Sequence, residues 1–240
     1  RGGDKNVPYL SIPEETKPFP GYRAMRIFLD RPEIFKVQLR ALLRASVYGK
    51  LRIMYPMISS VEEVRAANLI LEECKRELDA EGVSYSNELQ KGIMVEIPSA
   101  AIAADLIADE VDFFSIGTND LIQYTCAVDR MNEKISGLYN PFNPAVLRLI
   151  KNVIDAAHDN GIWCGMCGEA AADSRLIPLY LGMGLDEFSM SAGSMLKARK
   201  LISGLSYEKM QIMSRDALKI KTSDDIIAFL AENSAPEFNI

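Results

Sequence analysis

Three apolar segments of the chain each end in side chains that could do chemistry. Glu96 closes the first segment, and Asn119 and Asp120 follow the second. A thiol and a carboxylate, Cys167 and Glu169, close the third. Short apolar runs of this kind are typical of strands buried on both faces, and in parallel α/β folds reactive groups gather at the carboxyl ends of such strands. The spacing therefore predicts one site that draws on all three segments.

The polar pair after the second segment has a second interpretation. Asn and Asp are common helix N-caps, and a junction between a strand and a helix is where a cap is needed. At this junction alone, a capping role and a functional role explain Asn119 and Asp120 equally well. The functional hypothesis gains support from Glu96, because Pro98 ends the strand beside that carboxylate.

Apolar periodicity predicts an alternation of strands and helices. After Pro32 a helical pattern places Ile34, Val37 and Leu39 on one buried stripe. Strands that alternate with helices form parallel sheets with right-handed crossovers. We expect strands at 51–58, 92–97, 112–116, 162–167 and 186–190, and helices at 22–29, 33–48, 59–78, 99–108, 119–127, 145–160, 173–182, 193–202, 206–217 and 223–232.

Length and composition bound the class of protein. A chain of 240 residues that is 48% hydrophobic predicts one domain, 1–240, with a large core. A net charge of -6 argues against nucleic acid as a partner, because there is no basic surplus to neutralise phosphates. No apolar run approaches the roughly 20 residues that span a bilayer, and the chain starts without a signal segment. We therefore expect a soluble protein with no membrane partner.

The four cysteines indicate a reducing compartment, and hence a cytoplasmic protein, better than a disulfide framework. Cys164 and Cys167 form a C-x-x-C pair, but no second pair or histidine cluster completes a zinc site. Redox use of the pair does not suit its place inside an apolar strand. His158 falls in a helical pattern beside charges, which indicates a solvated helix residue.

Five predicted strands cannot close a barrel that needs eight, so either the sheet is open or the chain is a fragment. Eight motifs bear on this question, and they occur in the order Gly2-Gly-Asp-Lys5, Gly21-Tyr-Arg-Ala-Met-Arg26, Leu51-Arg-Ile-Met-Tyr-Pro-Met57, Met94-Val-Glu-Ile-Pro98, Phe113-Phe-Ser-Ile-Gly-Thr-Asn-Asp120, Val128-Asp-Arg130, Gly165-Met-Cys-Gly-Glu169 and Gly184-Leu-Asp-Glu-Phe-Ser-Met190. Together they resemble enzyme I of the bacterial phosphoenolpyruvate:sugar phosphotransferase system, in its C-terminal phosphoenolpyruvate-binding domain. The resemblance covers nearly the whole chain.

The resemblance implies an α/β fold, the (β/α)8 TIM barrel of the phosphoenolpyruvate/pyruvate type. In that family three strands precede the loop of the first motif, and two of them carry arginines that grip the substrate. We therefore expect a barrel truncated at its N-terminus, with about five of eight strands and without the N-terminal phosphohistidine and HPr-binding domains. By itself such a fragment is expected to be inactive and to bind phosphoenolpyruvate weakly or not at all.

The resemblance also implies Mg²⁺ as cofactor, with Glu96 and Asp120 as its ligands. Mg²⁺ takes oxygen ligands and commonly uses one or two carboxylates, which leaves its other positions to substrate and water. A carboxylate inside an apolar strand needs such a cation, because an unpaired buried charge is costly. Phosphoryl transfer needs the same cation, together with arginines, to neutralise three equatorial oxygens.

Substrate contacts follow from the same motifs. By resemblance, Asn119 contacts the phosphate through its amide, assisted by the backbone of Asp120, and Arg130 binds the phosphate in a bidentate way. The alternative for Arg130 is an ordinary loop charge. Lys5 and Arg23 match family positions that add positive charge near the substrate, although Arg23 could equally form a salt bridge on a helix face.

Cys167 is the catalytic residue that the resemblance implies. The enolate left after phosphoryl departure must be protonated at carbon to become pyruvate, and a thiol can do this. Judged by residue type alone, Cys167 would be a small buried strand residue.

The implied function is the phosphoenolpyruvate-binding part of a phosphotransferase. The full-length enzyme would transfer the phosphoryl group to its own N-terminal histidine and on to the phosphocarrier HPr for sugar uptake, releasing pyruvate, and it would dimerise through this domain. One alternative is the corresponding domain of a pyruvate phosphate dikinase or phosphoenolpyruvate synthase, which depends on ATP. The other is a catalytically silent regulatory barrel.

Overall fold

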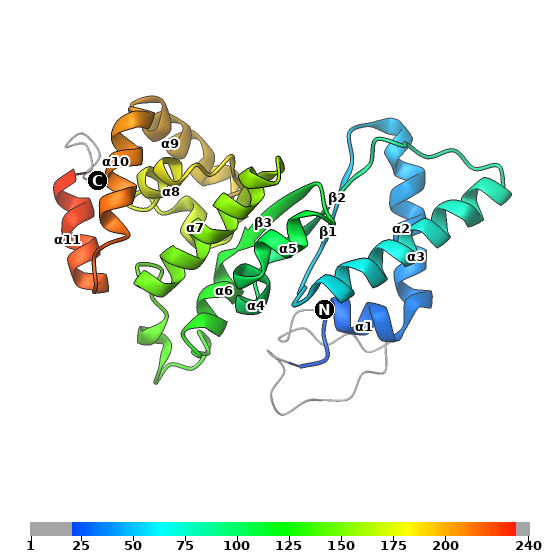
Figure 1. Ribbon diagram of the computed structural model, residues 1–240, viewed down its shortest axis with the longest axis horizontal. Helices are drawn as coiled ribbons and strands as arrows, with labels where there is room; N and C mark the ends of the chain where they lie inside the picture. Colours follow the sequence, from blue (N-terminus) through cyan, green and yellow to red (C-terminus); the bar gives the residue numbers. More distant parts are fainter. Residues whose placement is uncertain (1–20, 234–240) are drawn as a thin grey trace.

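A five-stranded parallel sheet forms the centre of the part of the chain that the computed structural model describes, residues 21–233 (Figure 1). Each strand pairs with its neighbours in chain order, so the sheet runs β1-β2-β3-β4-β5. The five predicted strands are confirmed, although the first and the last are shorter than expected. The strands are β1 (Arg52–Tyr55), β2 (Gln90–Val95), β3 (Phe113–Gly117), β4 (Trp163–Cys167) and β5 (Glu187–Phe188).

Helices connect the strands, as the alternation predicts. No helix within 21–233 is both long enough and apolar enough to cross a bilayer. The α-helices are α1 (Met25–Asp30), α2 (Pro32–Ala45), α3 (Val61–Ala80), α4 (Pro98–Ile102), α5 (Ala104–Ala108), α6 (Thr118–Thr125), α7 (Pro144–Asp159), α8 (Ile177–Met183), α9 (Ala192–Ser203), α10 (Tyr207–Ala217) and α11 (Ser223–Asn233), and the 3-10 helices are η2 (Ser46–Tyr48), η3 (Ser136–Leu138) and η4 (Glu169–Ala172).

Two predicted helices are interrupted. The helix expected at 99–108 is two short helices, α4 and α5, because the side-chain amide of Asn152 donates a hydrogen bond to the carbonyl oxygen of Ala101 at 2.8 Å. A side chain that bonds into the helical hydrogen-bond ladder is a cause of such breaks. The helix expected at 173–182 begins only at Ile177, since Pro178 is accepted in the first turn of a helix and not in its interior.

The buried stripe predicted for α2 is confirmed in part. Leu39 and Leu43 are fully buried, and Phe35 is nearly so. Val37, which was expected beside them, is 72% exposed. With 3.6 residues per turn, a position two residues from both Phe35 and Leu39 lies on the opposite side of the helix.

The two faces of the sheet carry different side chains. Alternate positions of the central strands, among them Ile93, Phe114 and Cys164, are fully buried in the main hydrophobic core. The intervening positions form a second face, which carries Ser115 and, at the end of β4, Cys167. Cys164 and Cys167 therefore lie on opposite faces and do not form a shared zinc or redox pair, in agreement with the sequence expectation.

Within the described residues the sheet does not close, since β1 and β5 each pair with a single neighbour. The eight-stranded barrel implied by the resemblance is therefore not confirmed, whereas an α/β fold with a parallel sheet is. The strand order rises without reversal, as it does within (β/α)8 barrels, whereas doubly wound sheets reverse their order at a switch point.

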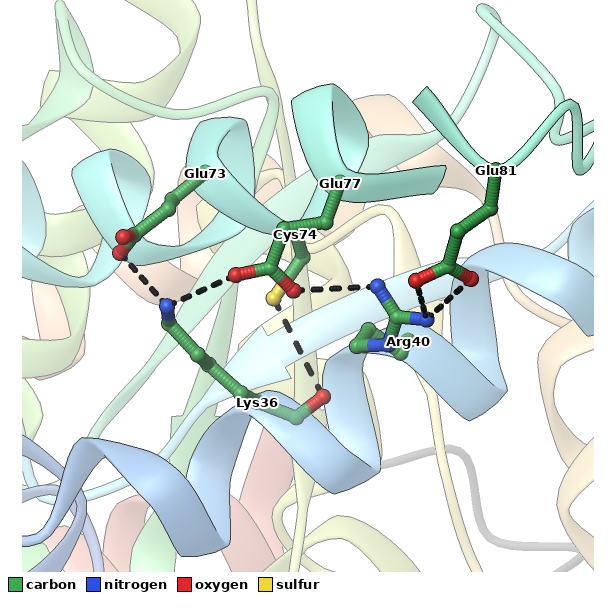
Figure 2. Close-up of polar contacts among 6 residues, drawn as sticks. All are labelled: Lys36, Arg40, Glu73, Cys74, Glu77 and Glu81. Carbon is green, nitrogen blue, oxygen red and sulfur yellow. Dashed lines mark hydrogen bonds and ion pairs between the residues drawn. The ribbon is translucent and has the colours of Figure 1, made fainter. Parts of the chain in front are cut away.

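Ion pairs fasten α2 to α3 (Figure 2). The Lys36 ammonium lies 2.9 Å from a Glu77 oxygen and 3.0 Å from a Glu73 oxygen. The Arg40 guanidinium lies 3.0 Å from the other Glu77 oxygen and 2.7 Å from Glu81. The hydrogen bond with Lys36 lowers the pKa of Glu77, and the same bond raises the pKa of Lys36. Glu77 is thus the carboxylate that both cations share.

We expect Glu77→Gln to lower the melting temperature (Tm) near pH 7, because Lys36 and Arg40 lose this shared partner. A carboxyl group whose pKa is lowered by folding stabilises the protein above its unfolded pKa, and this contribution is lost as pH falls through the folded pKa. The Tm difference between wild type and variant should therefore disappear well below pH 4.5, the ordinary pKa of glutamate. Thermal unfolding followed by circular dichroism at several pH values measures it. The control is Glu72→Gln, whose partner Lys75 lies on the same helix; an equal loss in both variants would contradict the prediction.

Candidate functional site

Glu96 lies one residue beyond β2, on the second face of the sheet, and is only 4% exposed. One of its carboxylate oxygens accepts a hydrogen bond from the backbone N–H of Met57 at 2.6 Å. Burial and, after it, the negative charge of Asp120 raise the pKa of Glu96. Hydrogen bonding with the Asp120 carboxyl group adds to this shift, so the two side chains lie close together. Their shared role as ligands stays a prediction.

Strained backbone lies next to the segments that carry site residues. In the described part of the chain, three residues other than glycine have φ in the left-handed region: Ala24 at 50°, Met57 at 58° and Ala127 at 51°. Met57 donates to Glu96, Ala24 follows Arg23, and Ala127 follows α6. Such conformations cost about 1–3 kcal/mol each and persist where the surrounding structure enforces them, often at functional sites. The strain therefore supports a site here independently of the carboxylates.

Arg23 brings a positive charge to the carboxylate pair. Its guanidinium lies 3.3 Å from a carboxylate oxygen of Asp120 and donates a hydrogen bond to the Tyr124 hydroxyl at 3.3 Å. The side chains of Arg23 and Asp120 are 12% and 19% exposed, so the pair is partly shielded from water. The pair joins the segment before α1 to the first turn of α6, so Arg23 does form a salt bridge, and its partner is a carboxylate of the candidate site.

Neither Asn119 nor Asp120 caps α6. The helix follows β3 without a loop, its N-cap is Gly117, and no side chain accepts a capping hydrogen bond there. The side-chain oxygen of Asn119 instead accepts hydrogen bonds from the Tyr139 hydroxyl at 3.3 Å and from the backbone N–H of Glu169 at 3.2 Å. The capping interpretation is therefore wrong, because both side chains bond to other segments of the chain.

Cys167 ends β4 opposite Gly117, the last residue of β3. Its carbonyl oxygen accepts a hydrogen bond from the Thr118 hydroxyl at 2.9 Å. Burial raises the pKa of the Cys167 thiol, and a hydrogen bond from Ser115 opposes this shift. The negative charge of Glu96 also acts on the thiol. The thiol and the carboxylates therefore share one edge of the sheet, and the thiol is protonated at neutral pH.

Arg130 lies on an exposed segment beyond α6, where its backbone N–H donates to the side-chain oxygen of Gln123 at 3.2 Å. Gln123 itself is buried. The positive charge of Arg130 opposes the rise that burial causes in the pKa of Tyr139, whose hydroxyl is the partner of Asn119. Lys5 lies outside the described residues, and its role stays a prediction.

Three residues of the cluster went unnoticed in the sequence: Tyr124, Gln123 and Tyr139. Tyr139 lies in the irregular segment between α6 and α7, where no periodicity marks a residue. Gln123 left a weak signal, because it is a polar residue that directly follows two apolar ones in a predicted helix. Its burial, and its hydrogen bond to the backbone of Arg130, are seen only in the structure.

The sequence of this chain matches a known protein family. Residues 1–207 match the family described as the phosphoenolpyruvate-binding domain of phosphoenolpyruvate-utilising enzymes. The chain is 58% identical over 231 residues to the phosphoenolpyruvate-protein phosphotransferase of Staphylococcus carnosus, 61% over 224 residues to that of Latilactobacillus sakei and 57% over 231 residues to that of Bacillus subtilis. These matches cover 96%, 93% and 96% of this chain, but 40%, 39% and 40% of the relatives. The chain thus spans about two fifths of the length of the curated relatives it matches.

We expect Gly168→Ala to destabilise the protein more than Gly161→Ala. Both glycines have positive φ, 100° and 71°, which strains any residue with a Cβ atom. A Cβ atom at Gly168 would also lie 3.0 Å from the Asn119 side-chain oxygen and collide with the Thr118 hydroxyl, whereas nothing lies within 4 Å of one at Gly161. The expected losses in the free energy of unfolding are about 1 kcal/mol at Gly161 and at least about 2 kcal/mol at Gly168. Urea denaturation measures both, and equal losses would show that the site does not depend on this close approach.

Proposed function

Because the chain belongs to the family of phosphoenolpyruvate-binding domains of phosphoenolpyruvate-utilising enzymes, we propose that it supplies the substrate site of a phosphoenolpyruvate-protein phosphotransferase. The observation that carries the proposal is the contact of Glu96 with Asp120, with Arg23 against Asp120, at the carboxyl ends of β2 and β3. In the reaction, the phosphoryl group passes from phosphoenolpyruvate to an enzyme histidine and on to HPr for sugar uptake. The names of the relatives favour this activity over that of a dikinase or synthase.

The phosphoryl group is the part of the substrate that the site must neutralise. During transfer, negative charge spreads over three equatorial oxygens, which fixed cations and hydrogen-bond donors stabilise. Arg23 and Arg130 supply the positive charge, and Asn119 supplies amide N–H groups. Asp120 already holds Arg23, and Gln123 holds the backbone of Arg130. Little conformational freedom is then lost when the substrate binds.

The two carboxylates fit a Mg²⁺ ion. A buried acid beside a second acid is destabilised unless a cation neutralises the pair, and the raised pKa of Glu96 reflects this. Among residues 21–233 no cluster of three or more His, Cys, Asp or Glu side chains could hold a metal, and Mg²⁺ commonly takes only one or two carboxylates. Glu96 and Asp120 would hold the ion, which would supply positive charge to the phosphoryl oxygens.

Cys167 acts as the proton donor to carbon in this proposal. Loss of the phosphoryl group leaves the enolate of pyruvate, whose methylene carbon must gain a proton. The S–H bond of Cys167 breaks, and a C–H bond forms with the electron pair of the enolate double bond. The resulting thiolate regains its proton from solvent. Burial raises the pKa of the Cys167 thiol further above neutral pH, so the group carries the proton that this role requires.

The wider assembly is also part of the proposal. Two cavities, of about 500 and 380 Å³, border β1, and Arg52 lines both of them. Further strands and helices of a (β/α)8 barrel would pair with the free edge of β1 and cover the smaller cavity, which β1 lines along its length. Family membership supports HPr as partner, a homodimer and a place in the cytoplasm, where the free cysteines of the described chain are stable.

Mg²⁺ should raise the Tm of the wild-type protein and leave that of Glu96→Gln unchanged. Glutamine keeps the shape of the side chain but removes one charged ligand and the repulsion toward Asp120. In EDTA the variant should therefore be at least as stable as the wild type. Thermal unfolding with EDTA or with MgCl2 measures both effects. Glu88→Gln, at an exposed residue outside the site, is the control and should respond like the wild type. A Mg²⁺-induced rise in Glu96→Gln equal to the wild-type rise would exclude Glu96 as a ligand.

Cys167→Ala should slow pyruvate formation about 10²- to 10⁴-fold and change the KM for phosphoenolpyruvate little, since the thiol acts in proton transfer rather than in binding. The assay couples pyruvate to lactate dehydrogenase. It uses a longer protein that contains this chain and has the full length of the curated relatives. Cys126→Ala removes another partly buried thiol and serves as the control. Pyruvate formation at the normal rate in Cys167→Ala would remove the thiol from its proposed role.

A further inference from the structure

Two groups hold the side-chain amide of Asn119, and one of them determines its orientation. The Tyr139 hydroxyl and the backbone N–H of Glu169 lie 3.3 and 3.2 Å from the same atom of that amide. A backbone N–H can only donate, so the atom that faces it must be the amide oxygen. The NH2 group of Asn119 therefore lies on the other branch of the side chain, where it is available to a ligand.

Tyr139 is suited to maintain this orientation. Its side chain is half-buried in the segment between η3 and α7. Burial raises the pKa of Tyr139 to about 12, so the hydroxyl keeps its proton and remains a donor at neutral pH. The positive charge of Arg130 acts on the same hydroxyl and opposes this shift. The Tyr139 hydroxyl thus contacts Asn119, the side chain proposed to bind the phosphoryl group from α6.

The cluster joins three separate segments of the chain. Asn119 belongs to the first turn of α6, Tyr139 precedes α7, and Glu169 begins η4 after β4. Gly168 permits the close approach of the third segment, because a Cβ atom there would lie 3.0 Å from the Asn119 oxygen. The orientation of one amide therefore depends on the relative placement of all three segments.

We infer that Tyr139 is a positioning residue for phosphoryl binding: its hydroxyl, together with the backbone N–H of Glu169, holds the Asn119 amide oxygen so that the NH2 group faces the phosphoryl oxygens. The inference rests on the proposed function, which supplies the phosphoryl group as the ligand. An NH2 group donates two hydrogen bonds, and anions accept hydrogen bonds strongly. The reversed amide would present its oxygen to the anion and repel it. Loss of the Tyr139 hydroxyl therefore acts on the substrate through Asn119.

The test is Tyr139→Phe, which removes the hydroxyl and keeps the ring. In the protein at the full length of its curated relatives, the KM for phosphoenolpyruvate should rise about 3- to 10-fold, the effect of losing one or two hydrogen bonds. The kcat should stay within about 2-fold, because the lost contact serves binding. Tyr48→Phe, at a residue that is 90% exposed, is the matched control and should leave KM unchanged. In an Asn119→Ala background, most of the effect of Tyr139→Phe should disappear.

A purely structural role for Tyr139 would give a different pattern. An unchanged KM in Tyr139→Phe, or an equal rise with and without the Asn119 side chain, overturns the inference. Tyr139→His keeps a ring N–H donor, should recover part of the lost affinity, and supplies the same comparison if the phenylalanine variant does not fold. A wild-type KM in Asn119→Ala alone would count against the proposed function of Asn119 instead, so the two failures are distinguishable.

Discussion

The site depends on one constraint: the carboxyl groups of Glu96 and Asp120 lie close together at an edge of the sheet that is largely shielded from water. Two like charges about 4 Å apart near a protein surface repel by about 4 kcal/mol. The Met57 N–H and the Arg23 guanidinium offset part of this repulsion between Glu96 and Asp120. Positive charge from a cation would relieve the rest. The arrangement is therefore poised for a ligand that brings a cation and an anion together, as a metal-bound phosphoryl group does.

The register of the parallel strands makes this contact possible. Val95 pairs with Ile116, so Glu96 and Gly117 follow at the same level, and Gly117 pairs in turn with Cys167. A Cβ atom on Gly117 would lie 3.1 Å from the Cβ atom of Glu96. The same Cβ atom would lie 2.9 Å from the Met94 side chain, so glycine at this position lets the end of β2 pack closely against β3. Acid, glycine and thiol thus form one row across three strands.

Sequence patterns predicted the ends of helices and strands well where a periodic pattern continues over many residues. They failed where a side chain from another element contacts the segment. The strands β3 and β4 and the helices α3 and α7 were predicted with ends near those observed. The break between α4 and α5 was not, because it depends on Asn152 of α7 reaching Ala101. The N-cap interpretation of Asn119 failed for the same kind of reason, since Tyr139 and Glu169 take its oxygen.

The sequence by itself determined the alternation of strands and helices, and with it the carboxyl-end placement of Glu96, Asp120 and Cys167. This follows because side-chain direction in a strand and helical periodicity are local properties of the chain. Only the tertiary structure decided that Arg23 pairs with Asp120, 97 positions away, and that the Tyr139 hydroxyl bonds to Asn119. Both contacts involve residues in irregular segments, where no repeating pattern limits the conformation and packing between distant parts of the chain sets the position of each side chain.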